Sequence, residues 1–401
     1  MKPFVLADDL SGAVEAGAAF HHAGWWVTLP LREDGGEQAE GELRVISTET
    51  RNAAASAAAA AVRSALRRSL AADGQLVFKK IDSTLRGPLG AELSAVIDEL
   101  APSIVLLCPA HPKAGRVVRN GALLVDGVAL EESEFRFDPV WPASTGNLTA
   151  LLAAQGVMAT CTLSRDALWG AVHPFDEIAE REARQGCTVV IADAESPADL
   201  ERIGALAASA ASRVVLVGSG ALAAVVADTR RTRNPAPAPM THASRALVVC
   251  GSRHDVSRRQ LDFLARERRA TVIDVFIDHE AAAIAREVTR ALQANPVVGL
   301  RLMPGTAPVV PAGLVQQLAN VAAGVLRACS IDLLYLTGGE TARAVLQVAA
   351  VARLEILTGL EGGAVACRPI GPPWHDVVVV TKPGGFGADE SMAQQLSYFM
   401  K

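Results

Sequence analysis

The amino-acid sequence predicts an α/β protein with two domains, each built on a mostly parallel sheet flanked by helices. The chain has 401 residues, more than a single hydrophobic core usually organises. Short apolar, β-branched runs alternate along it with longer helical patterns, which is typical of parallel sheets. This alternation stops where three prolines between 235 and 239 alternate with alanine, a pattern that favours an extended spacer. We therefore expect an N-terminal domain over 1–230, a Pro/Ala-rich linker over 231–245 and a C-terminal domain over 246–401.

Charge and hydropathy exclude several classes of partner. The net charge is −5, and no basic run is longer than two residues, as at Arg230–Arg231, so the chain lacks the electrostatic footprint of a nucleic-acid-binding protein. No apolar run is long enough to span a membrane. The chain turns acidic at Asp8, unlike a signal peptide. The six cysteines form no CxxC pair and are interpreted as reduced core residues. We expect a cytoplasmic protein that acts on small molecules.

In the first half, three strands are expected to end in polar loops. The strands cover 4–7, 76–81 and 104–108, and helices are expected at 52–72 and 88–100. In open α/β sheets, ligands bind at the carboxyl ends of strands. The loops that follow these three strands are therefore expected to line one pocket, which would contain the following candidates: Asp8, Asp9, Lys80, Asp82, Arg86, His111 and Arg116.

The residue types in these loops suit an anionic, hydroxylated ligand. Acidic residues at a helix start are often caps, but two adjacent carboxylates directly after a buried strand favour a site role for Asp8 and Asp9. A solvated sheet edge would also tolerate the lysines, acid and arginine of 79–87, although an acid-and-base cluster explains them better. Arginines 86 and 116 suit a carboxylate because the guanidinium fork binds it through two hydrogen bonds. His111 fits a solvent-facing position equally well.

The remainder of the chain continues the alternation. Residues 121–147 are irregular enough to hold a hairpin, and strands at 188–192 and 214–217 alternate with helices at 197–210 and 221–229. Gly218–Ala223 loosely fits the dinucleotide pattern GxGxxA, but the acidic residue expected about 20 positions later is missing. A tight strand–helix turn is the better interpretation, and a nicotinamide-dependent reductase is kept as an alternative.

In the second half, three expected strands end in small or glycine-rich turns. The strands cover 246–250, 333–336 and 377–380, and Ser257 is the expected N-cap of the first helix. Successive backbone N–H groups in such turns bind phosphate, whereas a single turn of this kind is more often plain turn chemistry. The candidate nucleotide-binding residues are Ser252, Gly338, Gly339, Glu340, Thr341, Lys382, Gly384 and Gly385. No spacing of histidines, cysteines or acids indicates a protein metal site.

Six motifs, taken in order, resemble the four-carbon acid sugar kinases, which phosphorylate threonate, erythronate or 3-oxo-tetronate with ATP. They are 7–13, 79–87, 109–116, 251–252, 337–342 and 382–387. The resemblance implies a sugar-acid domain followed by a domain that binds ATP, with Mg²⁺ bridging the phosphates. It also implies that either Asp9 or Asp82 orients or deprotonates the attacking hydroxyl. A homodimer would be unsurprising.

Three positions depart from the usual family pattern. Ser11 stands where threonine is usual, and Pro383, which has no backbone N–H, stands where serine is usual. His111 replaces a residue that is commonly aromatic, so the preferred sugar acid could differ. A non-catalytic sugar-acid sensor is therefore a further alternative, in which the motifs serve binding only.

Overall fold

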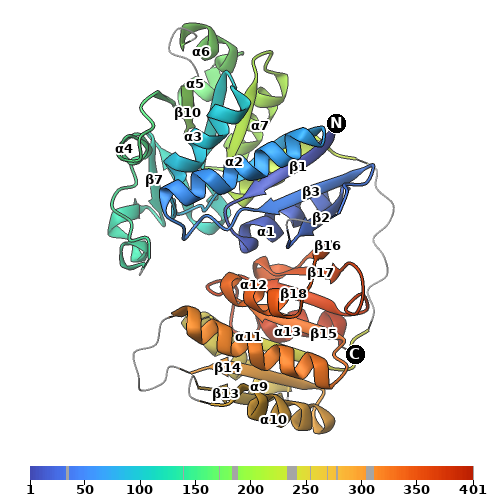
Figure 1. Ribbon diagram of the computed structural model, residues 1–401. Helices are drawn as coiled ribbons and strands as arrows, with labels where there is room; N and C mark the ends of the chain where they lie inside the picture. The colour runs from blue at the N-terminus through green and yellow to red at the C-terminus, as the bar shows by residue number, and fades with distance from the viewer. Residues whose placement is uncertain are drawn as a thin grey trace. The chain divides into compact units, whose positions relative to one another are not determined.

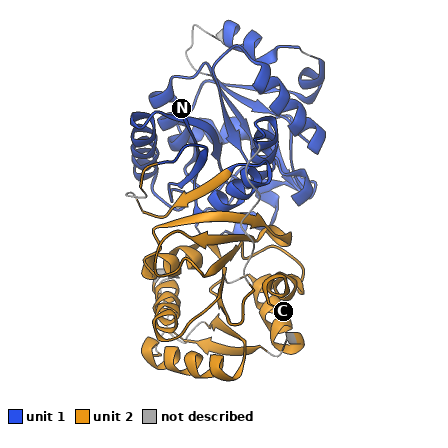
Figure 2. Ribbon diagram, turned by 90° about the vertical axis from the view of Figure 1, so that its right-hand side faces the viewer, with its two compact units in different colours: residues 1–25, 38–234 blue, residues 26–37, 235–401 orange. Residues whose placement is uncertain are grey.

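The computed structural model forms two compact units (Figure 2). Unit 1 comprises residues 1–25 and 38–234, and unit 2 comprises residues 26–37 and 235–401. Each unit has a mostly parallel sheet flanked by helices (Figure 1), which confirms the predicted fold class. The structure describes residues 1–32, 36–138, 140–170, 172–182, 188–232, 242–252, 254–268, 270–276, 279–303 and 311–400.

The described strands of the main sheet of unit 1 pair in parallel. All five residues of the strand at 104–108, Ile-Val-Leu-Leu-Cys, are buried, as expected for a parallel strand covered on both faces. Helix α1 (Leu10–His22) packs beside α8 (Gly220–Thr229), and α2 (Ala55–Ala71) packs beside α3 (Leu89–Leu100). The strand order is β3 (Glu42–Ser47), β1 (Lys2–Ala7), β4 (Gly74–Lys80), β11 (Val214–Gly218), β5 (Ile104–Cys108), β10 (Thr188–Ala192) and β9 (Thr160–Leu163). The helices are α1 (Leu10–His22), α2 (Ala55–Ala71), α3 (Leu89–Leu100), α4 (Leu148–Ala154), α5 (Arg165–Gly170), α6 (Pro174–Glu182), α7 (Pro197–Ser209) and α8 (Gly220–Thr229).

A small antiparallel sheet lies between β5 and α4 in the chain. It contains β6 (Arg116–Arg119), β7 (Ala122–Val125) and β8 (Val128–Ala129). The β7–β8 pair is the hairpin expected within 121–147. The 3-10 helices η1 (Pro112–Ala114), η2 (Leu130–Glu132) and η3 (Glu134–Phe137) complete this region.

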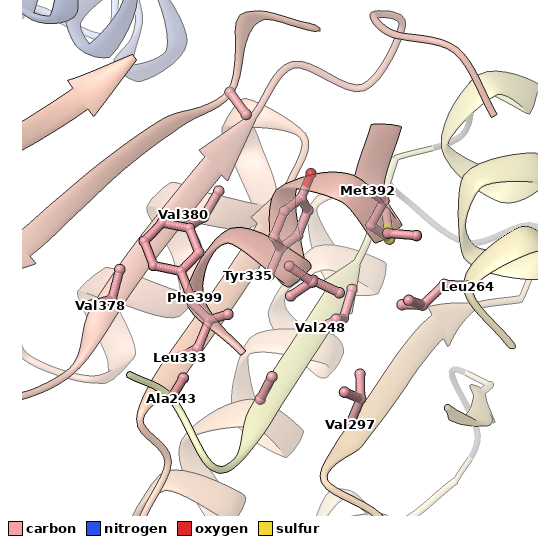
Figure 3. Packing of buried hydrophobic residues seen from close by; sticks show 14 of the residues in the cluster. Ala243, Val248, Leu264, Val297, Leu333, Tyr335, Val378, Val380, Met392 and Phe399 are labelled. Atoms are coloured by element: carbon pink, nitrogen blue, oxygen red, sulfur yellow. The ribbon is translucent and has the colours of Figure 1, made fainter. Parts of the chain in front are cut away.

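The sheet of unit 2 is parallel except along one side. Its core packs around the fully buried Tyr335, and Figure 3 shows Val248, Val380, Met392 and Phe399 in the same cluster. The parallel strands are, in order, β13 (Thr271–Val275), β14 (Val297–Leu302), β12 (Ala246–Cys250), β15 (Leu333–Thr337) and β18 (Val378–Lys382). Antiparallel strands β17 (Val365–Pro369), β16 (Arg353–Gly359) and β2 (Trp26–Pro30) follow. The helices are α9 (Asp255–Arg268), α10 (Ala281–Ala294), α11 (Pro311–Ala328), α12 (Gly339–Val348) and α13 (Ser391–Phe399), with a short 3-10 helix η5 (Glu361–Gly363).

Several local expectations differ from the structure. Residues 26–37, which the sequence analysis placed in the N-terminal domain, group with unit 2 because β2 pairs antiparallel with β16. The sequence analysis did not identify strands β2 and β3. Ser257 is not an N-cap, since α9 begins at Asp255, and its hydroxyl instead donates to the Gly384 carbonyl oxygen at 2.6 Å. Most of the predicted linker, 233–241, lies outside the described residues.

Two chemical features of the chain agree with its composition. The five described cysteines are free thiols, and Cys108, Cys250 and Cys367 are buried. Among the helices that the structure describes, none combines the length and the apolar character needed to cross a bilayer.

Candidate active site

The strand ends of unit 1 bring most of the predicted substrate residues together. Strands β3, β1 and β4 are neighbours, so the residues that follow them meet at one edge. The closeness is visible at Gly12, where an added Cβ atom would lie 2.9 Å from an Asp9 oxygen, 3.3 Å from Lys80 Nζ and 3.4 Å from an Asp8 oxygen. Only glycine leaves these three charged groups room to approach the start of α1.

Arg51 lies among the aspartates, although the sequence analysis did not identify it. It follows β3, and its Nε and Nη2 donate to the two carboxylate oxygens of Asp8 at 2.8 and 2.9 Å. Its Nη1 donates to Asp9 Oδ2. Burial raises the pKa of Asp8, but the charge of Arg51 and its hydrogen bonds outweigh burial and lower it overall.

Asp9 caps a helix and also lies within the cluster of charged side chains. As the N-cap of α1, it accepts a hydrogen bond from the backbone N–H of Gly12 at 2.7 Å through Oδ1. Its side chain remains 20% exposed, against 4% for Asp8. Burial raises the pKa of Asp9 to about 6 despite the opposing charge of Arg51, and the neighbouring charge of Asp8 adds to this rise. A carboxylate with a pKa near neutrality suits a general base.

Asp82 is bound more completely by protein donors. Arg86 donates to it from Nε and Nη2, both at 2.9 Å, and the Thr84 hydroxyl donates at 2.5 Å. Burial would raise the pKa of Asp82, but Arg86 and Arg51 outweigh it and hold this pKa well below its usual range. Arg86 also reaches Asp138 at 3.5 Å. The Asp82–Arg86 pair therefore resembles a structural clamp more than an acid–base group.

A second group lies beside this cluster and is centred on Glu15, which the sequence analysis did not identify. Its carboxylate forms an ion pair with Lys80 Nζ at 3.0 Å and lies 3.8 Å from His111 Nε2. Burial lowers the pKa of His111 and so favours its neutral imidazole, although the charge of Glu15 opposes this shift. The solvent-facing interpretation of His111 is wrong, because its side chain is 24% exposed and faces Glu15. Arg116 donates to the Ser83 hydroxyl at 2.7 Å, and its guanidinium lies over the Phe135 ring.

The Gly218–Ala223 segment is a tight strand–helix turn. Ser219 caps α8 by accepting from the N–H groups of residues 221 and 222. An added Cβ atom on Gly220 would lie 2.1 Å from a Glu15 oxygen, and one on Gly218 would lie 2.3 Å from the Cys108 carbonyl oxygen. Close packing therefore explains both glycines.

In unit 2, the predicted nucleotide residues meet at the ends of three neighbouring strands, β12, β15 and β18. An added Cβ atom on Gly384 would lie 2.0 Å from Ser252 Oγ, and one on Gly251 would lie 2.1 Å from Thr341 Oγ1. Gly338 has a φ of +97° and precedes α12, whose first residues are Gly339 and Glu340. The three turns thus expose backbone at a helix N-terminus, an arrangement that suits phosphate.

The turns at 251–252, 338–341 and 384–385 are called the phosphate cradle below. Lys382 is the last residue of β18 and lies next to this cradle. Its side chain is buried, and its Nζ donates to the Pro383 carbonyl oxygen at 2.9 Å. Burial lowers the pKa of Lys382 to about 8. Gly385 packs against the imidazole of His254. No group of three histidines, cysteines or acids in the described part of the chain is arranged to hold a metal ion.

Comparisons with known proteins decide the family. Residues 4–226 match the model of a sugar-binding N-terminal domain, and residues 247–392 match that of a nucleotide-binding C-terminal domain. A D-threonate kinase from Bordetella bronchiseptica is 31% identical over 96% of this chain and 94% of its own length. The chain belongs to the four-carbon acid sugar kinase family.

A second curated relative agrees with this assignment, and a solved structure shares the fold. A D-erythronate kinase from Heliobacterium modesticaldum is 29% identical over 99% of this chain and 96% of its own. A crystal structure from Salmonella typhimurium LT2 shares the fold, with a TM-score of 0.84 over 99% of each chain at 23% identity. The predicted class of activity, a sugar-acid kinase, is confirmed by these relatives. The alternative of a nicotinamide-dependent reductase has no support from them.

Proposed function

We propose that the chain transfers the γ-phosphoryl group of ATP to a hydroxyl of a four-carbon sugar acid of the threonate, erythronate or 3-oxo-tetronate type. The observation that carries this proposal is the contrast among three neighbouring aspartates. Asp8 and Asp82 are held by guanidinium forks, whereas Asp9 is the most exposed and has a pKa raised to about 6. Asp9 is therefore the general base in this proposal, and Asp82 orients Arg86.

The sugar acid would bind at the unit 1 edge through its charge and its hydroxyls. Arg116 is the better candidate for the carboxylate, because Arg86 already binds Asp82 through two nitrogens. Lys80 and His111 face Glu15 beside the aspartates, where a hydroxylated chain would find both donors and acceptors. Asp9 accepts the proton of the attacking hydroxyl, the hydroxyl oxygen bonds to the γ-phosphorus, and ADP leaves with the electrons of the broken P–O bond.

The nucleotide would bind at the unit 2 edge. The backbone N–H groups of 339–341 and the turn at 384–385 would surround the phosphates, with Ser252 beside them and Lys382 opposing their charge. Mg²⁺ would be held by phosphate oxygens and water, as is common for this ion with nucleotides. Its chemistry would be to neutralise charge that develops during transfer.

The test measures ADP release with Mg-ATP and a panel of D- and L-threonate, D-erythronate, 3-oxo-tetronates and glycerate. We expect turnover that depends on one acid, and a loss of kcat of about 10²–10⁴-fold in Asp9→Asn. Asp98→Asn, at an exposed carboxylate paired with Arg63, is the matched control and should retain full activity. Wild-type turnover in Asp9→Asn would contradict the role of Asp9.

Binding without turnover would favour the sensor alternative. Calorimetry would then show ATP and one sugar acid binding while no acid in the panel released ADP. Pro383, which removes a backbone donor from the turn after β18, is the feature that favours this outcome. A cytoplasmic location and a homodimer stay predictions.

A further inference from the structure

Backbone contacts hold Arg51 in place, independently of the contacts that its side chain makes. The N–H groups of Thr50 and Arg51 both donate to the Asp8 carbonyl oxygen, at 2.8 and 3.2 Å. On the other side, Gly87 has a φ of +99°, and an added Cβ atom there would lie 3.0 Å from the Arg51 carbonyl oxygen. The residues that follow β1 and β4 therefore hold Arg51 between them.

The guanidinium of Arg51 is placed among three carboxylates. Its side chain is 13% exposed. Two of its nitrogens, Nε and Nη2, are used by Asp8, while Nη1 donates to Asp9 and lies 3.9 Å from Asp82. Arg51 is thus a planar donor that fixes the angle between Asp8 and Asp9, which a point charge such as an ammonium group does less well.

We propose that Arg51 is a positioning residue that keeps Asp9 ionised and oriented to accept the proton of the sugar-acid hydroxyl. This inference rests on the proposed role of Asp9 as the base. Four groups face the Asp9 carboxylate: Arg51, Lys80 and the Gly12 N–H favour its ionised form, whereas Asp8 opposes it. Arg51 has the largest favourable effect of the three and is in direct hydrogen-bonding contact with Asp9.

A different role would give different kinetics. If Arg51 served only to bind the carboxylate of the sugar acid, its loss would raise KM and leave the pH dependence of kcat unchanged. If it holds Asp9 ionised, its loss raises the pKa of Asp9, so a smaller fraction of the enzyme has the ionised base at any given pH. The acidic limb of the kcat profile must then move to higher pH.

The experiment measures kcat and KM from pH 5 to 9.5 for the wild type and for Arg51→Gln, Arg51→Lys and Arg63→Gln. With the pKa of Asp9 at about 6 in the wild type, Arg51→Gln should move the acidic limb upward by about 1–3 pH units, as expected when an adjacent opposite charge is lost. Arg51→Lys keeps the positive charge but loses the planar donor, so the acidic limb of the kcat profile should stay near its wild-type pH while the maximal kcat falls. Arg63→Gln, at an exposed ion pair, should change neither. An unmoved limb in Arg51→Gln with a raised KM would overturn the inference.

A second measurement does not depend on turnover. The ¹³C resonance of the Asp9 carboxyl, assigned by comparison with Asp9→Asn, is titrated in the wild type and in both Arg51 variants. A higher midpoint in Arg51→Gln than in the wild type supports the inference even if no acid in the panel is phosphorylated, in which case only the proposed function fails. If Arg51→Gln does not fold, the Arg51→Lys plateau decides, because wild-type kcat in that variant would contradict an orienting role.

Discussion

The state of Lys382 predicts that nucleotide binding takes up a proton. The side chain is 2% exposed, and no carboxylate contact accompanies its hydrogen bond to the Pro383 carbonyl oxygen in the described part of unit 2. Burial lowers its pKa to about 8, although the nearby Cys250 acts in the opposite direction. If Lys382 faces the phosphates, they supply the missing negative charge, and its pKa must rise when the nucleotide binds.

The magnitude follows from this pKa and from linkage. With a pKa of about 8 in the free protein, Lys382 is about 90% protonated at pH 7 and about 10% protonated at pH 9, so the affinity for ADP should fall about tenfold between these values. At pH 8, binding should take up about half a proton. Lys382→Met removes a charge-assisted hydrogen bond worth about 1.5–3 kcal/mol, which weakens binding roughly 10- to 150-fold.

Titration calorimetry with ADP provides the assay. The measurement is repeated at pH 7, 8 and 9, and at pH 8 in two buffers of different ionisation enthalpy, which gives the proton uptake directly. Lys2→Met, at the first residue of β1 in unit 1, makes the same chemical change away from the cradle and should leave affinity and uptake unchanged. An affinity for ADP that does not vary between pH 7 and pH 9 would show that Lys382 does not face the phosphates.

Two further substitutions test the strand ends of unit 2 and those of unit 1 independently. Gly384→Ala places a Cβ atom 2.0 Å from Ser252 Oγ, so it should weaken ADP binding at least about tenfold and leave sugar-acid binding intact. The control is Gly170→Ala, whose added Cβ atom meets no atom within 4 Å. If calorimetry gives Gly384→Ala and the wild type equal affinities for ADP, the proposed phosphate site at these turns is wrong. Asp82→Asn removes the carboxylate charge that Arg86 binds through two nitrogens and leaves the 3.5 Å contact of Arg86 with Asp138. Because Arg86 is 31% exposed, the change should cost about 2–3 kcal/mol of unfolding free energy in urea at pH 7, less than for a fully buried pair. Because the pKa of Asp82 is depressed in the folded state, its contribution is present above the unfolded value of about 3.9 and is lost as pH falls through the lower folded value. The variant should therefore lose less stability than the wild type below about pH 4, and an unchanged acid dependence would contradict this.

The sequence predicted the fold class and the location of both edges for a simple physical reason. Buried parallel strands need continuous apolar runs, so the runs that became β1, β4, β5, β12, β15 and β18 were visible, together with the polar or glycine-rich residues after each. Strand β3 was missed because Glu42 and Arg44 interrupt its apolar residues, so that no continuous apolar run marks it, and 48–51 was not recognised as a loop at a strand end. The signal was nevertheless present, since Thr-Glu-Thr-Arg follows that strand and is as polar as the loops that were recognised.

The choice between Asp9 and Asp82 shows where sequence reasoning ended. Both aspartates follow apolar strands, so their local patterns are equivalent, and what separates them is the number of donors that surround each carboxylate. The partner of Asp82 is local: Arg86 stands four residues later and binds it through two nitrogens, and this spacing was visible in the sequence. The partner of Asp9 is Arg51, 42 residues away and brought near only by the parallel pairing of β1 with β3. Because Arg51 follows a strand that the sequence analysis did not identify, Asp9 could be proposed as the base only after that pairing was known.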